Sequence, residues 1–407
     1  MTSTHPRAGS DDTGSPDTAA TANSTSPATQ PDAETKWKDR KKYLWILGLV
    51  VPILPFRAAA HADSFGGLFW WLGPIAVMVL IPILDLVFGT DRANPPESAV
   101  EGLEASHWYR WVLYLYLPLQ YAGLIYGAYV ITSTNMSWFD QLGFSITVGV
   151  VAGVGINAAH ELGHKREKSE RFMSRLALAQ SAYGHFYVEH NRGHHLRVAT
   201  PEDPASSRLG ESFWEFLPRT VVGSLRSAWE IETKRLRGRN MRVFSHHNDL
   251  LTGWAMTLVL FGGIVTVFGL GAIPYLLIQA VVGFWLLEVV NYIEHYGLKR
   301  QKKESGRYER CQPEHSWNAN HRVSNFLLYQ LERHSDHHAH PTRRYQALRH
   351  FDEAPQLPSG YAGMLVLACV PPLWRRVMDQ RVIDHYDGDV SLTNLHPRHA
   401  DRYLVAA

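Results

Sequence analysis

The chain has 407 residues, and its 40 Lys and Arg residues nearly balance 38 Asp and Glu residues, leaving a formal net charge of +2. This balance gives no reason to expect nucleic acid as a partner. Two cysteines, Cys311 and Cys369, exclude a disulfide scaffold, a four-cysteine metal site and a cysteine-held iron–sulfur cluster within the chain. The 22 histidines are unusually many for this length.

The N-terminal residues 1–35 are rich in Ser, Thr, Asp, Ala and Pro and contain no aromatic residue. They can bury too little apolar surface to offset the entropy of folding. We expect a disordered tail there, a transmembrane and cytoplasmic catalytic domain over residues 36–350, and a cytoplasmic or interfacial segment over residues 351–407.

Apolar stretches long enough to cross a bilayer, which takes roughly 20 helical residues, follow the tail. There are six, at residues 43–60, 68–88, 111–132, 142–159, 251–270 and 273–292. Lys and Arg collect before the first stretch, after the fourth and after the sixth, and are missing from the intervening turns at 61–67, 133–141 and 271–272. The positive-inside rule then places both termini in the cytoplasm. The predicted fold is all-α, a polytopic membrane protein with six transmembrane helices and a cytoplasmic histidine-rich cap.

Histidines recur at metal-binding spacing where the predicted helices leave the membrane. His160 and His164 are four residues apart, so both rings share one helical face. Two further boxes and one single histidine extend the set to His160, His164, His190, His194, His195, His295, His334, His337 and His338. Nine imidazoles exceed the shell of any single first-row ion, so we expect a site for at least two metals. Imidazole suits iron, copper, zinc and nickel, and spacing does not choose among them.

Two other interpretations of these boxes stay open at this point. His160, Glu161 and His164 match the motif of zinc proteases, in which the glutamate is the general base, and predict a zinc intramembrane metalloprotease. Such a protease needs three ligands and leaves six of the nine histidines unused. A metal transporter would hold its ligands near the bilayer midplane, whereas these histidines lie at the predicted cytoplasmic helix ends.

Four strings of the sequence resemble the signatures of membrane-bound alkane 1-monooxygenases, a branch of the histidine-box fatty acid desaturase and hydroxylase superfamily. They are HELGHK (160–165), EHNRGHH (189–195), NYIEHYG (291–297) and LERHSDHH (331–338), the last differing in Glu332 where glutamine is common. The resemblance covers roughly residues 43–345. An acyl desaturase or another hydroxylase of this superfamily is the alternative within it.

The resemblance implies two non-haem irons held by the nine histidines, and O₂-dependent terminal hydroxylation of n-alkanes to 1-alkanols. It also implies that rubredoxin, reduced by rubredoxin reductase, supplies the electrons, which agrees with a chain that has too few cysteines for its own rubredoxin-type site. The expected location is the bacterial cytoplasmic (inner) membrane, with the metal site on the cytoplasmic side.

Helix periodicity also predicts residues that meet the substrate. Counting back from His160 along its own face gives Ile156, Gly153 and Gly149, and counting back from His295 gives Leu287 and Phe284. We hypothesise that these faces line a tunnel to the metals; the alternative is that Gly149 and Gly153 merely allow close helix packing.

Charged residues near the boxes are candidates for supporting roles. Metal-bound imidazoles often donate their other nitrogen to a carboxylate, and the candidates are Glu161, Glu189, Asp203, Glu288, Glu294 and Asp336. Arg192, Arg197, Arg343 and Arg344 could attract an acidic electron donor, or simply form a solvated basic face.

Overall fold

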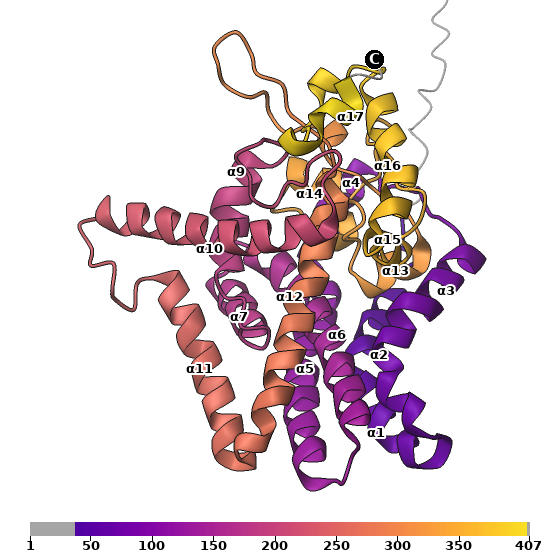
Figure 1. The fold of residues 1–407 in the computed structure, drawn as a ribbon, viewed down its shortest axis with the longest axis vertical. Helices are drawn as coiled ribbons and strands as arrows, with labels where there is room; N and C mark the ends of the chain where they lie inside the picture. Colours follow the sequence, from indigo (N-terminus) through magenta and orange to yellow (C-terminus); the bar gives the residue numbers. More distant parts are fainter. Residues whose placement is uncertain (1–36, 405–407) are drawn as a thin grey trace, which may run out of the picture. The chain divides into compact units, whose positions relative to one another are not determined.

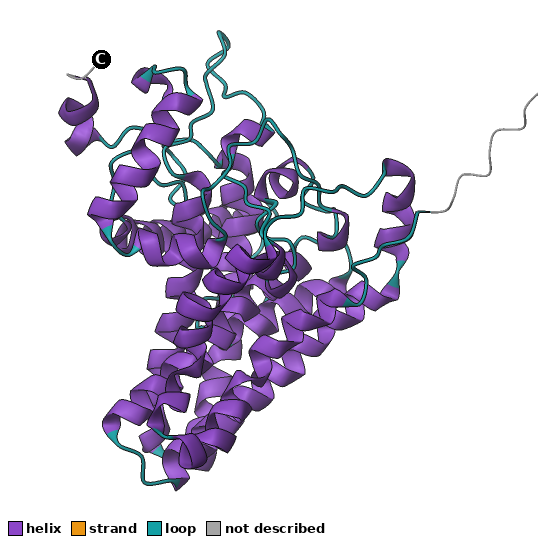
Figure 2. Cartoon of the chain, turned by 90° about the vertical axis from the view of Figure 1, so that its right-hand side faces the viewer, coloured by secondary structure: helices purple, strands orange, loops and turns teal. Residues whose placement is uncertain are grey.

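The computed structural model describes residues 37–404, which form helices joined by loops (Figures 1 and 2). Within this range there is no β-strand, and the chain forms four isolated β-bridges instead. The all-α fold class is therefore confirmed for the described residues. The tail predicted at residues 1–35 lies outside them.

Five helical segments of the described chain are long and apolar enough to cross a membrane. They are Leu44–Ala62, Gly67–Phe88, Trp138–Gly163, Asp249–Phe268 and Leu270–His295, and they match five of the six predicted stretches. The third predicted stretch lies in α5 (His107–Ser133), whose 27 residues are long enough to span but include six tyrosines, which lower its hydropathy. A sixth span through α5 stays a prediction.

Prolines interrupt the first two of these segments. The first begins as a 3-10 helix, η1 (Leu44–Ile53), which contains Pro52, and continues as α1 (Leu54–Phe65). The second passes through η2 (Gly67–Trp71), α2 (Leu72–Ile75), a π-helical turn η3 (Ala76–Leu80) and α3 (Ile81–Phe88). Proline lacks the N–H that a regular helix uses, so the backbone departs from α geometry near these positions.

The central pair of helices is α6 (Trp138–Gly163) and α12 (Ile273–His295), which lie side by side in Figure 1. Glycines allow their close approach: a Cβ added to Gly149 would lie 2.6 Å from Cβ of Val282, and one added to Gly153 would lie 2.9 Å from Cβ of Leu286. This is the packing role that the sequence left as an alternative for the two glycines. Because both helices end at the same level, they bring His160 and His295 to one end of the bundle.

The remaining elements form a cap over that end of the bundle. The cap includes α4 (Glu97–Ala105), α7 (Lys168–Ala179), α8 (Phe186–Glu189), η4 (His190–His194), α9 (His195–Arg197), α13 (Arg322–Leu327) and α14 (His334–Ala339). Another helix, α10 (Phe213–Arg237), crosses the bundle direction before α11 (Asp249–Phe268) runs back along it (Figure 1). The C-terminal helices α15 (Tyr361–Ala368), α16 (Pro371–His385) and α17 (Ala400–Leu404) complete the cap.

The C-terminal segment packs directly on α12. Trp374 of α16 is fully buried, and its ring centroid lies 4.9 Å from that of Tyr292 and 5.2 Å from that of Tyr296. In α15, Tyr361 and Leu365 are both nearly inaccessible. The end of the chain therefore supports the helix that carries His295.

Candidate metal centre

All nine histidines predicted as ligands lie together under the cap, in two clusters. The ring nitrogens of His160, His164, His190, His195 and His337 lie within 4.8 Å of one another, and so do those of His194, His295, His334 and His338. We call these the five-histidine cluster and the four-histidine cluster. Each is large enough to enclose one metal ion, so the geometry agrees with a site for two.

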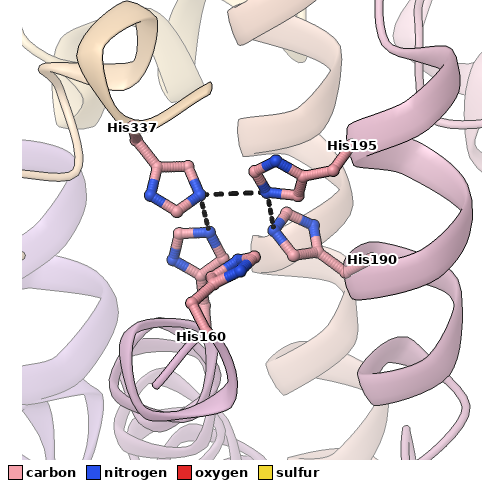
Figure 3. Close-up of side chains that lie close together, drawn as sticks. His160, His190, His195 and His337 are labelled. Atoms are coloured by element: carbon pink, nitrogen blue, oxygen red, sulfur yellow. Dashed lines mark hydrogen bonds between the residues drawn. The ribbon is translucent and has the colours of Figure 1, made fainter. Parts of the chain in front are cut away.

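The five-histidine cluster joins three segments of the chain. His160 and His164 come from the end of α6, His190 and His195 from the turn after α8, and His337 from α14 (Figure 3). The Nε2 atom of His337 lies 2.9 Å from that of His160 and 3.1 Å from that of His195. His195 Nε2 is in turn 3.1 Å from His190 Nε2, so these nitrogens point at one another.

The second histidine box departs from the predicted spacing. His190 and His194, four residues apart, belong to different clusters, whereas His190 and His195, five apart, share one. The reason is the backbone: residues His190–His194 form a π-helical turn, in which the hydrogen-bond period is five residues instead of four. The wider turn sends His194 to the four-histidine cluster, so this box contributes to both clusters.

The third box is divided between the clusters as well. His334 and His338, one turn apart on α14, place their Nε2 atoms 2.9 Å from each other in the four-histidine cluster. His337 points the other way, into the five-histidine cluster. Since both α14 and the turn after α8 contribute to each cluster, the two candidate metal positions are held by shared elements.

The chemistry of these side chains fits metal ions. Ring nitrogens that face one another at hydrogen-bond distance cannot all be donors, because a neutral imidazole carries a single N–H. The Nε2 atoms of His164 and His194 are buried and have no hydrogen-bond partner among the described residues. Leaving buried lone pairs unpaired is costly, whereas a bound cation would accept them.

Burial keeps these rings in the form that binds metals. For six of these histidines, all outside the membrane-spanning segments, desolvation lowers the pKa below the ordinary value of 6.5, and the neighbouring histidines lower it further. They are His164, His190, His195, His334, His337 and His338. Neutral imidazoles expose a lone pair at neutral pH, as ligation requires.

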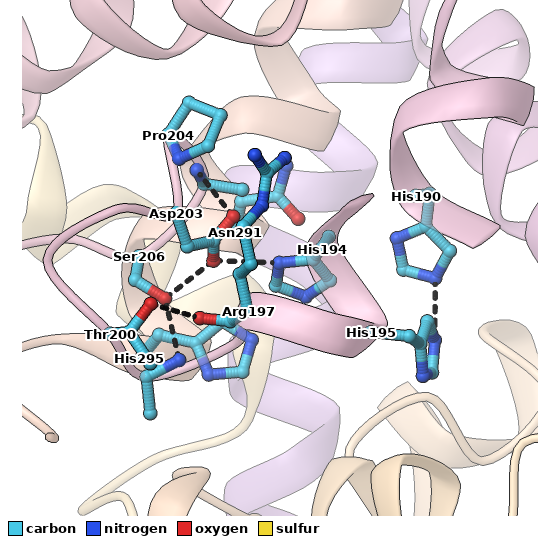
Figure 4. Close-up of polar contacts among 12 residues, drawn as sticks. His190, His194, His195, Arg197, Thr200, Asp203, Pro204, Ser206, Asn291 and His295 are labelled. Carbon is cyan, nitrogen blue, oxygen red and sulfur yellow. Dashed lines mark hydrogen bonds and ion pairs between the residues drawn. The ribbon is translucent and has the colours of Figure 1, made fainter. Parts of the chain in front are cut away.

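Two of the predicted carboxylates contact the four-histidine cluster. Asp203 Oδ2 accepts a hydrogen bond from His194 Nδ1 at 2.9 Å and another from Ser206 (Figure 4). Burial alone would raise the pKa of Asp203, but its contacts with His194 and Ser206 lower it. Glu294 Oε1 lies 3.2 Å from His334 Nδ1, without the alignment of a hydrogen bond. With His194 donating through Nδ1, its Nε2 is left to face the cluster.

The other four carboxylates are engaged elsewhere and have no hydrogen bond to the nine histidines among the described residues. Glu161 pairs with Lys165, Glu189 with Arg197, and Asp336 with Arg349. Glu288 accepts hydrogen bonds from Tyr183, Thr220 and Asn291. These four candidates therefore support none of the nine imidazoles through a hydrogen bond, because basic, hydroxyl or amide groups lie closer.

Sequence reasoning missed one supporting contact. The Nδ1 atom of His295 lies 3.4 Å from the backbone carbonyl oxygen of His315, which orients this ring as Asp203 orients His194. A backbone carbonyl leaves no mark in the sequence, so no motif could have shown it.

Glu332, which stands where glutamine is common, is completely buried and accepts backbone hydrogen bonds from His321 and Tyr361. Burial raises its pKa to about 8. At neutral pH this carboxyl is therefore mostly uncharged, which makes it a physical equivalent of glutamine.

A cavity of about 420 Å³ leads to both clusters. His160 and His190 of the five-histidine cluster and His334 of the four-histidine cluster line its inner end, with Glu294 and Asn291 nearby. Apolar side chains of η1, α2, η3, α3, α6, α12, α13 and α15 form most of its walls. The volume is in the range of small-molecule sites.

The residues predicted to line the substrate route are divided. Gly153 and Leu287 line the cavity, whereas Gly149, Ile156 and Phe284 are not among its lining residues. Ile156 is fully buried in the core, and Phe284 stacks on Tyr183 with ring centroids 5.1 Å apart. These three residues do not line the cavity, because much of its wall comes from the first two membrane segments. The periodicity of α6 and α12 alone does not show which of their residues face those segments.

Comparison with known proteins agrees with this geometry. Residues 136–368 match the fatty acid desaturase family. The chain is 47% identical over 371 residues to an alkane 1-monooxygenase from Acinetobacter baylyi, covering 90% of this chain and 91% of that protein. It is 44% identical over 374 residues to one from Ectopseudomonas oleovorans, covering 92% and 93%. The chain belongs to the alkane 1-monooxygenases, within the fatty acid desaturase family. The suspected family is thereby confirmed, and with it the assignment as an enzyme.

A more distant relative is named for different hydrocarbons. A xylene/toluene monooxygenase hydroxylase component from Pseudomonas putida is 28% identical over 321 residues, which is 76% of this chain.

The hydrogen bond between Asp203 and His194 generates a testable prediction. Asp203→Asn removes the charge that orients this ring, and such contacts typically account for about 10- to 100-fold in metal affinity. We expect the variant to lose one of two metal ions per chain during dialysis against a chelator, followed by elemental mass spectrometry. Asp379→Asn is the matched control, because Asp379 accepts hydrogen bonds from Tyr296 and Tyr403 instead. Equal metal retention by Asp203→Asn and wild type would contradict the assigned contact.

Proposed function

We propose that the protein hydroxylates the terminal methyl group of n-alkanes, using O₂ and electrons from rubredoxin, at two iron ions held by the five- and four-histidine clusters. The observation that carries this proposal is the apolar cavity whose inner end is lined by His160, His190 and His334. One channel thus reaches both metal positions. The names of the similar alkane 1-monooxygenases support the substrate and the reaction.

The choice of iron rests on the reaction. Nine imidazoles without a thiolate are compatible with iron but equally with copper, zinc and nickel. The reaction favours iron, because activation of O₂ for hydroxylation is chemistry that non-haem iron supplies when bound. Around it, Asp203 orients His194 and the His315 carbonyl oxygen orients His295.

An n-alkane has no polar group for recognition, so its binding must rely on shape and on removal of apolar surface from water. The cavity supplies both through side chains such as Val154, Leu286 and Phe326. On α6 it extends from Val150 to His160, which is about 15 Å at the usual helical rise. We infer that a chain enters methyl end first and that the depth of the cavity sets its preferred length.

The cavity also reaches the surface of the bundle. Leu47, Val50, Leu80 and Phe88 line it and are exposed, and all four belong to the first two membrane segments. Alkanes partition into the bilayer, so this opening supports direct entry from lipid. We further propose that the cap faces the cytoplasm of a bacterial inner membrane, which the Lys and Arg distribution supports.

The alternatives fit the site less well. A zinc protease would need Glu161 as a free general base, but Glu161 is paired with Lys165 at 2.9 Å and accepts a hydrogen bond from the Tyr345 N–H. An acyl desaturase would use the same cluster chemistry but would need a place for a polar headgroup. Sequence similarity to alkane 1-monooxygenases over about nine-tenths of the chain favours hydroxylation.

A product assay tests the proposal. Purified protein of known iron content, in nanodiscs with reduced rubredoxin, ¹⁸O₂ and a mixture of n-alkanes, is expected to yield labelled 1-alkanols by gas chromatography with mass detection. An iron-loaded protein that oxidises no alkane but desaturates an acyl substrate would overturn it, and so would a protein that contains zinc.

Cavity depth gives a second prediction. Ala76 lines the cavity near Val150, at the end away from the histidines; the Gly73 N–H, one turn earlier, bonds Thr147 of α6 at 3.0 Å. Ala76→Phe fills that end, so we expect the preferred alkane to become shorter by several carbons.

The control for this variant is Val79→Phe, in the same turn but exposed and outside the cavity lining. Competition between alkanes of different length, with products quantified by gas chromatography, measures the change. An unchanged chain-length profile in folded Ala76→Phe protein would show that the cavity does not hold the substrate.

A further inference from the structure

The loop between α12 and α14 carries an exposed basic hairpin. Residues 299–310 contain six Lys and Arg residues against two glutamates. Lys302, Lys303, Arg307 and Arg310 are exposed. Figure 1 shows this orange loop projecting from the cap at the end of the bundle opposite the turn between α11 and α12. The positively charged side chains of the hairpin therefore lie away from the membrane-spanning helices.

The hairpin is an ordered structure. Lys302 and Tyr308 form an antiparallel bridge, the Lys303 N–H donates to the Arg307 carbonyl oxygen at 2.9 Å, and Gly306 makes the turn with a φ of +74°. Below the bridge, the N–H groups of Gln301 and Glu309 each bond to the other residue. The positive side chains are therefore displayed on a defined support.

The exposed basic residues of the hairpin are not the four arginines that the sequence suggested as a face for an acidic electron donor. Arg192 pairs with Glu232 and Asp249, both at 2.7 Å, and Arg197 pairs with Glu189. Arg343 pairs with Glu97 and Asp336. Arg344 pairs with Glu167 and Glu170. In contrast, the four exposed hairpin residues form no ion pair with any residue in the range 37–404, and Glu309 is occupied by His315.

The base of the hairpin is connected to both clusters. Arg300 donates from its backbone N–H to the Ala199 carbonyl oxygen at 2.7 Å and from its guanidinium to the Leu196 carbonyl oxygen at 2.8 Å, directly after the turn that carries His194 and His195. On the other side, Glu309 contacts the ring of His315 at 3.2 Å, and the His315 carbonyl oxygen contacts His295 Nδ1. A short chain of contacts thus links the loop to a ring of the four-histidine cluster.

We propose that this hairpin is the docking surface for a small, acidic one-electron carrier protein, which delivers electrons next to His315 and His295. The inference rests on the proposed function, because it requires an external donor. Hydroxylation of one alkane by O₂ consumes two electrons and two protons and yields the alkanol and water. A one-electron carrier is therefore oxidised twice per turnover and must dock and leave twice. Charge attraction speeds such encounters without requiring tight binding.

Charge reversal tests the proposal with a matched control. The test variant combines Lys302→Glu, Lys303→Glu and Arg307→Glu. The control combines Arg237→Glu, Arg239→Glu and Arg242→Glu. These three arginines are exposed and lie at the C-terminal end of α10 and in the loop after it. The control changes the net charge by the same amount as the test variant. The full chain is placed in nanodiscs of neutral lipid, and the probe is a purified rubredoxin of negative net charge.

Two measurements are made on each protein. The first is the Kd for oxidised rubredoxin at low and high salt, by biolayer interferometry, which needs no turnover. The second is the KM for reduced rubredoxin and the rate with dithionite, a small reductant that needs no docking. We expect the hairpin variant to raise Kd and KM at least about tenfold at low salt, and to lose most of the salt dependence. Its rate with dithionite should equal that of wild type.

The outcomes separate the two claims. If the hairpin variant binds rubredoxin like wild type, or if the control weakens binding equally, the docking surface is wrong. If wild type binds rubredoxin through the hairpin yet forms no alkanol with either reductant, the proposed function fails while the docking result stands.

Discussion

The burial of nine imidazoles with their nitrogens directed at two points is the constraint on which this structure depends. Seven of these histidines are buried and the other two, His164 and His195, are partly buried, and polar groups left unpaired inside a protein are costly. Several ring nitrogens lie about 3 Å from one another. Because each neutral imidazole has a single N–H, hydrogen bonds between the rings can satisfy only some of these nitrogens. Metal ions would supply the missing partner, and their binding would couple folding of the cap to formation of the centre.

The rest of the fold keeps these rings in place. The glycine-mediated contact between α6 and α12 sets the level of His160 and His295, and the π-helical turn after α8 distributes the second box between both clusters. Outside the cap, the proline-interrupted segments Leu44–Ala62 and Gly67–Phe88 leave an apolar space beside α6. Ligand geometry and substrate route thus arise from the same departures from regular helix packing.

Much of this could be predicted from sequence, and the failures have physical causes. Spacing and position predicted the nine histidines that the structure brings together in two clusters. The pairing of His190 with His195 could not be predicted, because nothing in Asn191-Arg192-Gly193 signals a π-helical turn. The cavity walls were missed for a similar reason: residues near 47, 80, 326 and 365 meet only through tertiary packing. Carboxylate roles depended on which basic side chain lay nearest, which is also a tertiary property.

Metal stoichiometry and coordination test the central claim most directly. Elemental mass spectrometry of the purified protein, together with iron K-edge X-ray absorption spectroscopy, reports both. The account predicts two irons per chain with first shells dominated by imidazole nitrogen and without sulfur. A single metal ion per chain, or zinc in its place, would contradict it.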